Sequence, residues 1–274
     1  MRVEFWGVRG SSATPDADKV RYGGNTISVV VTLKSQPAHF FVLDAGTGLA
    51  RFGSDLLDTQ HEYEAHVLLS NLHLYHIIGF QFTPLAYSPL CHTVVIGPNT
   101  RHLALESVFD HIMAPSYSPV YGLAHLNADA QFQEVTPQTI KIRNVQVTPY
   151  PFAVGTDGES WGYRLSNGNA AIAYLMDVPV RDKSGDLLPQ TLELVDGAAL
   201  MIVGAYDPAH ERGQHVNYED GIELARSGGV PRLCFTHHHP TITDDELDAL
   251  QDELQQHVTD IEVTVAAEGL IYEF

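Results

Sequence analysis

The sequence predicts an α/β protein in which two β-sheets pack face to face and helices cover both outer faces. Strand patterns and helix patterns alternate along the first third of the chain, and the same layout returns in the second half. The chain has 274 residues, of which 44% are hydrophobic, so it can bury a large core. Two sheets with helices outside are the simplest arrangement for such a series. We expect residues 1–274 to form a single domain rather than two small ones.

The first third of the chain consists of short strands joined by glycine-rich turns. The turns at 7–11 and 44–48 contain glycines that allow positive φ or a close backbone approach. Apolar residues recur with helical spacing after the second turn and again from residue 77. In chain order the expected strands are 2–6, 26–33, 40–43 and 66–69, and the expected helices are 49–57 and 77–85.

The middle and the second half continue the alternation. Residues 114–121 form a loop rich in proline and tyrosine, which is either a flap over a site or a packed surface loop. The helix expected at 244–257 is acidic and amphipathic, with leucines on one face. The remaining expected strands are 93–96, 131–135, 140–148, 162–165, 170–175, 198–203, 232–235 and 262–266, and the remaining helices are 103–113 and 220–227.

Charge and cysteine content narrow the function classes. Fifteen Lys and Arg against 34 Asp and Glu give a net charge of −19, and this field repels nucleic-acid phosphates and acidic membranes. We therefore expect neither a nucleic-acid partner nor a membrane partner. Cys91 and Cys234 lie in apolar settings, which is typical of free thiols in a reducing cytosol. Without a signal-peptide pattern or a membrane-length apolar stretch, the sequence favours a cytoplasmic protein.

The densest group of candidate metal ligands lies in residues 70–79. This segment follows the strand 66–69 and reads S-N-L-H-L-Y-H-I-I-G. His73 and His76 can each offer a divalent metal a nitrogen lone pair at about 2.0 to 2.1 Å. The amide oxygen of Asn71 is a poor zinc ligand, and the phenol of Tyr75 must first lose a proton with a pKa of about 10. The two histidines are therefore the only ordinary nitrogen ligands of the segment.

The segment resembles the loop S-H-x-H-x-D-H-x-x-G of the metallo-β-lactamase superfamily, with Asn71 in place of the first His and Tyr75 in place of the Asp. Further landmarks of one branch of that superfamily follow in order: FWGVRGS at 5–11, RYGGNT at 21–26, LDAGTG at 43–48, GYR at 162–164 and THHHP at 236–240. That branch resembles phosphodiesterases of cyclic or other small phosphodiesters. The resemblance implies an αββα sandwich that holds two metal ions, bridged by an Asp and a hydroxide, between the edges of its sheets.

Seven ligand positions are implied by this resemblance, and three of them have lost their ligand. The intact positions are His73, His76, Asp177 and His237, and the altered ones are Asn71, Tyr75 and a histidine missing from 151–154. Position 71 and the missing histidine would serve the first metal, and position 75 the second. A metal with two or three protein donors loses much of its binding free energy, so we expect the two-metal mechanism to fail. Any residual catalysis is expected to depend on Asp177 and His76.

Other candidates lie in or near these landmarks. Arg9 and Arg164 are the cations expected to hold a ligand phosphate, with a structural salt bridge as the alternative. Asp44, grouped with these substrate-binding residues, either orients the ligand-bearing loop or caps its turn. His215 keeps the histidine of a substrate-flanking segment. In the run 237–239 alternate side chains point to opposite faces, so we expect one histidine to face the site.

Two functions of different classes remain open. The first is a pseudoenzyme whose degenerate dinuclear site binds a small metabolite, a nucleotide or a protein partner. The second is a metal-dependent phosphodiesterase, a hydrolase of small or cyclic phosphodiesters that uses one residual metal site. The cofactor is accordingly one divalent ion, Zn²⁺, Fe²⁺ or Mn²⁺, or none. The expected ligand is a small molecule, with or without phosphate, and a homodimer is left open.

Overall fold

The strands of this computed structural model form two seven-stranded sheets. It describes residues 1–274 except 57–60, 117, 119–121, 127–128, 155–157 and 206–215. The first sheet has the spatial order β14 (Ile271–Glu273), β1 (Arg2–Gly7), β2 (Ser28–Leu33), β3 (Gln36–Leu43), β4 (Tyr63–Leu68), β5 (Cys91–Gly97) and β6 (Asp129–Glu134). The second has the order β13 (Glu262–Val265), β12 (Arg232–Thr236), β11 (Leu200–Gly204), β10 (Ala171–Leu175), β9 (Gly158–Ser166), β8 (Val145–Val154) and β7 (Ile140–Ile142).

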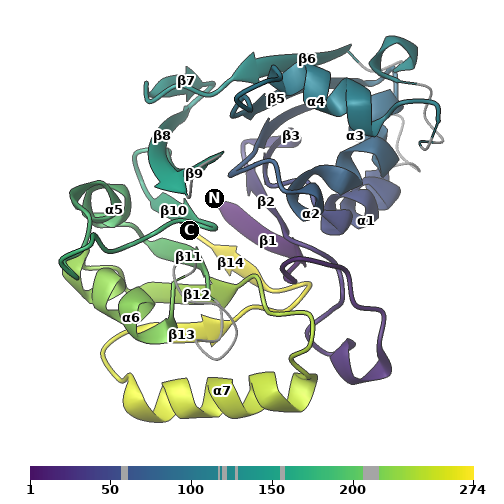
Figure 1. The fold of residues 1–274 in the computed structure, drawn as a ribbon. Coiled ribbons are helices and arrows are strands. Elements are labelled where there is room, and N and C mark those ends of the chain that lie inside the picture. Colours follow the sequence, from purple (N-terminus) through teal and green to yellow (C-terminus); the bar gives the residue numbers. More distant parts are fainter. Residues whose placement is uncertain (57–60, 117, 119–121, 127–128, 155–157, 206–215) are drawn as a thin grey trace.

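Helices lie outside both sheets, as Figure 1 shows. The first sheet is accompanied by α1 (Thr47–Leu56), α2 (Leu74–Ile77), η2 (Ile78–Phe82), α3 (Pro84–Tyr87) and α4 (Leu105–Ile112). The second is accompanied by α5 (Pro189–Val195), α6 (Tyr218–Ser227) and α7 (Asp244–His257), and the short turns η1 (Ala17–Lys19) and η3 (Leu123–His125) complete the described helices. The predicted sandwich of two mixed sheets between helices is therefore confirmed.

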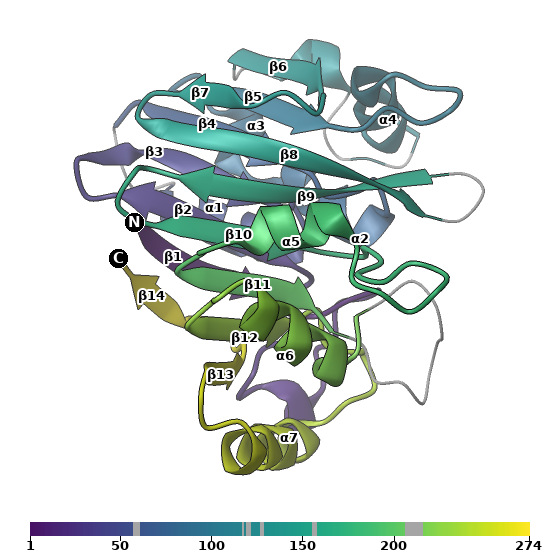
Figure 2. The same cartoon turned by 90° about the vertical axis from the view of Figure 1, so that its left-hand side faces the viewer.

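The direction of the strands decides where a site can form. From β3 to β6, and again from β10 to β13, neighbouring strands are parallel. The carboxyl ends of parallel strands meet at one edge of a sheet, and ligands bind there in open α/β sheets. Figure 2 shows α2 and the far end of the β8–β9 hairpin on the right of the molecule, and the turn between β7 and β8 on the left.

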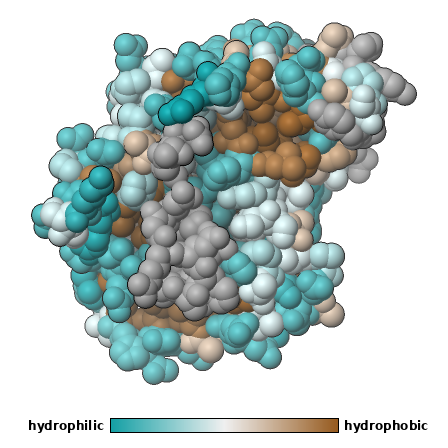
Figure 3. Space-filling view, in the orientation of Figure 1, coloured by the Kyte–Doolittle hydropathy of each residue, from teal (hydrophilic) through white to brown (hydrophobic). Residues whose placement is uncertain are grey.

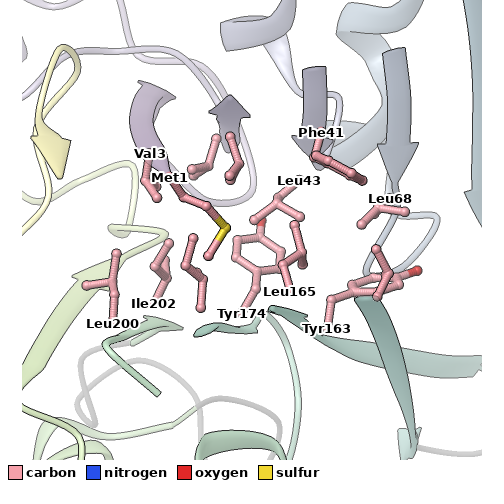
Figure 4. Close-up of a cluster of buried hydrophobic side chains, with 14 of the residues drawn as sticks. Met1, Val3, Phe41, Leu43, Leu68, Tyr163, Leu165, Tyr174, Leu200 and Ile202 are labelled. Atoms are coloured by element: carbon pink, nitrogen blue, oxygen red, sulfur yellow. The ribbon is translucent and has the colours of Figure 1, made fainter. Parts of the chain in front are cut away.

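The largest apolar cluster fills the space between the two sheets. Alternate residues of one strand divide between the layers: Phe41 and Leu43 face the other sheet, whereas Val42 packs beneath the helices. Figure 4 shows this layer, in which side chains of the first sheet meet Tyr174, Ile202 and their neighbours from the second. Separate apolar clusters join each sheet to its own helices. The sandwich thereby gives the strand ends a rigid base.

Several expected elements differ in detail from those observed. The helix expected at 77–85 is divided into α2, η2 and α3, because Thr83, which precedes a proline, is extended at φ −105° and ψ 142°. The strand expected at 140–148 is divided by a turn at Arg143, which has φ 53°. Helix α5 and strand β14 were not expected. Half of the flap predicted at 114–121 lies outside the described residues.

None of the helices in the described part of the chain is long and apolar enough to cross a membrane. Cys91 and Cys234 are both buried as free thiols, as their apolar settings predict. Burial raises the pKa of the Cys234 thiol to about 12 and also raises that of Cys91, which keeps both thiols protonated at neutral pH. Neither thiol is therefore suited to nucleophilic chemistry.

Candidate metal centre

The loop that carries the histidines is fixed between two strand ends. After β4 the chain turns through residues 69–73 and enters α2, where His76 lies in the only turn of the helix. The turn that follows β3 lies alongside, because Ala45 N donates to His76 O at 2.6 Å and Gly79 N donates to Ala45 O at 2.8 Å. A Cβ on Gly79 would lie 1.8 Å from Gly46 O. The glycine that ends the motif is thus required by close backbone contact.

Asp44 holds this loop from beneath. Its carboxylate is fully buried and accepts the Ser70 N–H and the Ser70 hydroxyl, both at 2.8 Å, and the Tyr174 hydroxyl at 2.7 Å. Oδ2 of Asp44 also lies 2.8 Å from Nδ1 of His76. A carboxylate on one imidazole nitrogen fixes the ring and directs the other nitrogen forward. Asp44 therefore orients His76, and its expected contact with substrate is corrected, because protein groups surround it.

Asp177 is the point at which the other side chains meet. It follows β10 in the left-handed region with φ 49°, and its side chain is 2% exposed. Oδ2 of Asp177 lies 3.1 Å from Nε2 of His76, 3.0 Å from Nδ2 of Asn71 and 3.4 Å from the Tyr75 hydroxyl. A non-glycine residue in this backbone region costs free energy, so the surrounding structure must hold it there. The position aims the carboxylate at the loop of the opposite sheet.

The amide of Asn71 has one orientation that its neighbours allow. Its Oδ1 accepts the backbone N–H of His73 at 2.9 Å, and its Nδ2 donates to Asp177 at 3.0 Å. Reversing the amide would place two acceptors against each other at Asp177 and two donors against each other at His73. The group that faces the carboxylate is therefore an NH₂, which has no lone pair for a metal.

His73 and Tyr75 lie on the open side of this group. The Tyr75 hydroxyl is 3.0 Å from Nδ1 of His73, and the same nitrogen is 3.5 Å from Oδ2 of Asp177. The His73 side chain is 53% exposed, whereas that of His76 is fully buried. One donor atom each from His73, His76 and Asp177 lies within 4.8 Å of the other two, which is close enough to share one metal ion.

One histidine of the run 237–239 faces this group. His237 follows β12 with φ 65°, is fully buried, and places Nε2 3.8 Å from Oδ1 of Asp177. Its ring stacks on that of His76 with centroids 5.4 Å apart, and a Cβ on Gly10 would lie 2.5 Å from it. His238 instead bonds to Ala266 O, and His239 lies 2.6 Å from the Thr241 hydroxyl.

The electrostatics of His76 favour a proton when no metal is bound. Burial alone would lower the pKa of its imidazole, but the carboxylates of Asp44 and Asp177 outweigh burial and raise the pKa to about 10. The imidazolium then lies between two carboxylates. A metal that takes Nε2 must displace this proton, so metal binding and proton release are coupled.

Arg9 and Arg164, which were expected to hold a phosphate, point into the protein. The Arg9 side chain is fully buried: Nε donates to Gly23 O, Nη1 donates to Ile242 O, and Nη2 lies 3.6 Å from Asp244. Arg164 lies on the outer face of its sheet and donates to Leu194 O at 2.8 Å. Both expectations are corrected, because Arg9 is buried against backbone carbonyls and Arg164 lies on the face of its sheet that is turned away from the site.

Two further expectations concerned His215 and the histidine missing from 151–154. His215 lies outside the described residues. The missing histidine would come from the end of β8, where Pro151, Phe152 and Ala153 carry no ligand atom, and Phe152 packs among the apolar residues beneath α5 to α7.

Three supporting residues were missed by sequence reasoning. Besides Ser70 and Tyr174, which hold Asp44, Tyr163 donates from its hydroxyl to Leu69 O at 2.7 Å. Burial and the nearby Asp44 raise the pKa of both tyrosines well above the usual range, so both remain donors. For Tyr174 the available signal was a tyrosine within the fully apolar strand β10, because a buried phenol needs an acceptor.

Solved structures resemble the chain over nearly its full length. A diphosphatase of the PhnP family superposes with a TM-score of 0.69 and 16% identity, over 100% of this chain and 97% of that chain. The metallo-β-lactamase fold protein YhfI from Bacillus subtilis gives a TM-score of 0.69 and 17% identity, over 99% of each chain. This chain has the metallo-β-lactamase fold. Zn²⁺-bound PqqB from Methylobacterium extorquens gives 0.69 and 15% identity, over 100% of both chains. No protein-family model and no curated protein matches the sequence.

Proposed function

We propose that this metallo-β-lactamase-fold protein binds a small ligand at its candidate metal centre, which we call the cleft site, holds at most one divalent metal ion there, and lacks two-metal hydrolase chemistry. The orientation of Asn71 carries the proposal. Its NH₂ group donates to Asp177, and its oxygen is taken by the backbone of His73. Where a two-metal enzyme needs a lone pair directed at the metal, this chain supplies a hydrogen-bond donor.

The first of the two metal positions has too few donors. With Asn71 donating and no ligand atom on the side chains of Pro151, Phe152 or Ala153, His73 and Asp177 are the donors that remain for it among the residues that the structure describes. Asp177 would also have to serve the second position. Two donors, one of them shared, give a first-row metal ion little binding free energy, so a dinuclear centre is disfavoured.

One ion suits the residues that remain. The donor atoms of His73, His76 and Asp177 lie within 4.8 Å of one another, and His237 lies next to Asp177. Two or three imidazoles and a carboxylate are suitable for Zn²⁺, Fe²⁺ or Mn²⁺. When bound, such an ion would act as a Lewis acid on a ligand oxygen. The protein's own part is to fix His76 through Asp44 and to keep the base of the site dry.

Exposed apolar surface near the site supports the binding of a ligand with an apolar part. Leu74, next to His73, is 56% exposed, and Figure 3 shows apolar surface on the half of this face formed by the first sheet and its helices. Arg9 and Arg164 bond to backbone carbonyls, so neither is placed to hold a phosphate group, which among the described residues of the site could contact a metal ion or the histidines. The net charge of −19 disfavours a nucleic-acid partner.

A second candidate function is a mononuclear phosphodiesterase. It is supported by the cluster of His73, His76 and Asp177, and by the fold that the chain shares with a diphosphatase of the PhnP family. This alternative uses the same single ion. It differs from the first only in whether a phosphodiester is hydrolysed.

The metal content of the cleft tests the main proposal. Zinc, iron and manganese per chain are measured by inductively coupled plasma mass spectrometry in untagged wild type and in Asp177→Ala. Because Asp177 would contact either metal, the difference between the two proteins counts the cleft ions. We expect a difference of one or none, and a difference of two contradicts the proposal. His239→Gln, whose ring lies beside Thr241, is the matched control and should leave the content unchanged.

Hydrolysis of bis(p-nitrophenyl) phosphate separates the two candidates. The non-catalytic function predicts no turnover above background. A turnover of about 1 per second or more, abolished by EDTA and by His76→Ala, would establish the phosphodiesterase instead.

A further inference from the structure

A second group of metal-ligating side chains lies where β3 and β4 begin. His39 pairs with Glu64 across these parallel strands, and Phe41 pairs with His66. Because Phe41 and Leu68 face the other sheet, His39, Glu64 and His66, which alternate with them, point to that side as well. The candidate metal centre follows the opposite ends of the same strands. The two groups therefore lie at different ends of the sandwich, and the proposed function does not use this one.

The spacing of the three donor atoms matches a tetrahedral metal site. Nε2 of His39 lies 3.0 Å from Nδ1 of His66 and 3.6 Å from Oε1 of Glu64, and these last two atoms are 3.9 Å apart. Metal bonds of about 2.0 to 2.1 Å place tetrahedral donors about 3.3 to 3.4 Å from one another. The three observed spacings scatter around this value, so small rotations of the side chains would bring the three atoms onto one face of a tetrahedron.

The charges around the group leave the donors available. Arg143, from the turn between β7 and β8, bonds to Oε2 of Glu64, so the other carboxylate oxygen faces the histidines. Nε2 of His39 and Nδ1 of His66 are hydrogen-bonded to each other at 3.0 Å, so one of the two nitrogens carries a proton. A metal ion that takes both nitrogens requires this proton to move to the other nitrogen of its ring.

The open side of the group faces a surface hollow. His39 and Glu64 line a hollow of about 540 Å³, together with His92 from β5 and Asp129 from β6. Nδ1 of His92 lies 2.8 Å from the Asp129 carboxylate, a polar pair on the rim. The side chains of His39, His66 and Glu64 are 3%, 12% and 28% exposed. The group is thus buried on the side of the sandwich and open on the side of the hollow, which leaves the fourth metal position for water.

We propose that His39, Glu64 and His66 form a second, peripheral site for Zn²⁺ or a similar first-row divalent ion. Two imidazoles and one carboxylate are a donor set that zinc takes with a water as fourth ligand. The ion would join β3 to β4 and, through Glu64 and Arg143, would also connect the first sheet to the hairpin of the second. It would act as a structural ion for the strands that carry Asp44 and the histidine loop at their other ends.

Zinc titrations on a chain without the cleft site test this proposal. In Asp177→Ala, purified without a tag and stripped of metal, we expect one equivalent of Zn²⁺ to bind, measured by competition with a chromophoric chelator. Adding His66→Gln should raise the Kd at least about tenfold. Adding His61→Gln, an exposed histidine just before β4, should change it less than about twofold. Absence of zinc binding in Asp177→Ala, or equal binding after His66→Gln, would overturn the proposal.

A second measurement does not depend on any variant folding correctly. In wild type, ¹⁵N spectra of the imidazoles during zinc addition identify the ligating nitrogens. We expect Nε2 of His39 and Nδ1 of His66 to shift together at one equivalence point, separate from any shift of His73 or His76. Unchanged signals of His39 and His66 at saturating zinc would contradict the peripheral site, whatever happens in the cleft.

Discussion

At the scale of single residues, the cleft depends on which group faces Asp177. A lone pair at position 71 or 75 would bring a metal to the carboxylate, whereas the NH₂ of Asn71 and the hydroxyl of Tyr75 are placed to donate to it. Each donor stabilises the carboxylate without an ion. Under the proposed function, the same two residues would hold the site together without a metal ion and would limit its capacity to bind one.

Asn71→His with Tyr75→Asp should therefore restore metal affinity. The double variant gives each metal position one more donor, and we expect zinc to bind in the cleft about tenfold or more tightly than in wild type. Chelator competition measures this. Tyr75→Phe in place of Tyr75→Asp is the control, because it removes the hydroxyl without adding a ligand. Equal affinities of the double variant and the wild type would show that these positions do not limit binding.

Tyr174 tests the support beneath the histidine loop. Tyr174→Phe removes the hydroxyl that bonds to the buried Asp44 carboxylate, and we expect a loss of about 2 kcal/mol in the free energy of unfolding. Tyr163→Phe, the matched change at a neutral carbonyl, should cost about 1 kcal/mol. Urea denaturation measures both. A larger loss for Tyr163→Phe would contradict the view that the charge of Asp44 makes its hydrogen bond stronger.

The residues that meet in the site could be predicted from the sequence, but the residues that hold them in place could not. His73, His76, Asp177 and His237 came from a resemblance to a spaced motif, and the structure brings all four together. That they bind a metal stays a prediction. Arg9 was misjudged because its acceptors, Gly23 O and Ile242 O, come from segments far apart in the chain, and no local pattern reveals such a contact.

At the scale of elements, strand ends and helix caps determine how the site is held. Thr83 caps α3 by accepting Leu85 N, and Pro84 ends the preceding turn, so the helical segment that follows the histidine loop is divided. The apolar periodicity of 77–85 predicted a single helix. Such a pattern indicates which side of a segment is buried, but it does not indicate where the backbone bends. Strand β14 was missed because only three of its residues pair with β1.

His66 on β4, which faces His39 on β3, should make the free energy of unfolding depend on pH. The pKa of His66 falls from 6.5 to about 4 on folding, mainly through burial, so only the unfolded chain takes up its proton between these values. Stability is therefore complete above about pH 6.5 and is lost as the pH falls towards 4, by at most about 3 kcal/mol.

Urea unfolding at a series of pH values, in EDTA to exclude metal, measures this dependence. His66→Gln should flatten the slope between pH 6.5 and 4, whereas His61→Gln should keep it. An unchanged slope in His66→Gln would assign the effect to other groups.

At the scale of the whole molecule, the two halves are joined by buried contacts between distant segments. Arg9 in the first turn of the chain bonds to Ile242 O and faces Asp244 at the start of α7. Asp244 also accepts the backbone N–H groups of Arg21 and Tyr22. These contacts position the segment that carries His237, so a residue expected to bind phosphate instead organises the fold.

Arg9→Met should accordingly destabilise the protein and not merely weaken ligand binding. It leaves Asp244 buried without its cation, and we expect a loss of about 3 kcal/mol or more in the free energy of unfolding. Arg164→Met, whose guanidinium bonds to a neutral carbonyl, should cost less. Chemical denaturation without ligand measures both, and a loss below about 1 kcal/mol for Arg9→Met would show that the contact is dispensable.

The residues of the candidate metal centre are divided between the two sheets. Asp44 and the loop with His73 and His76 belong to the first sheet, whereas Asp177 and His237 belong to the second. Any ligand or ion that touches Asp177 and His73 together spans the seam between two separately hydrogen-bonded layers. Such an occupant acts as a cross-link, and slippage of one layer against the other would release it without any change in its immediate contacts.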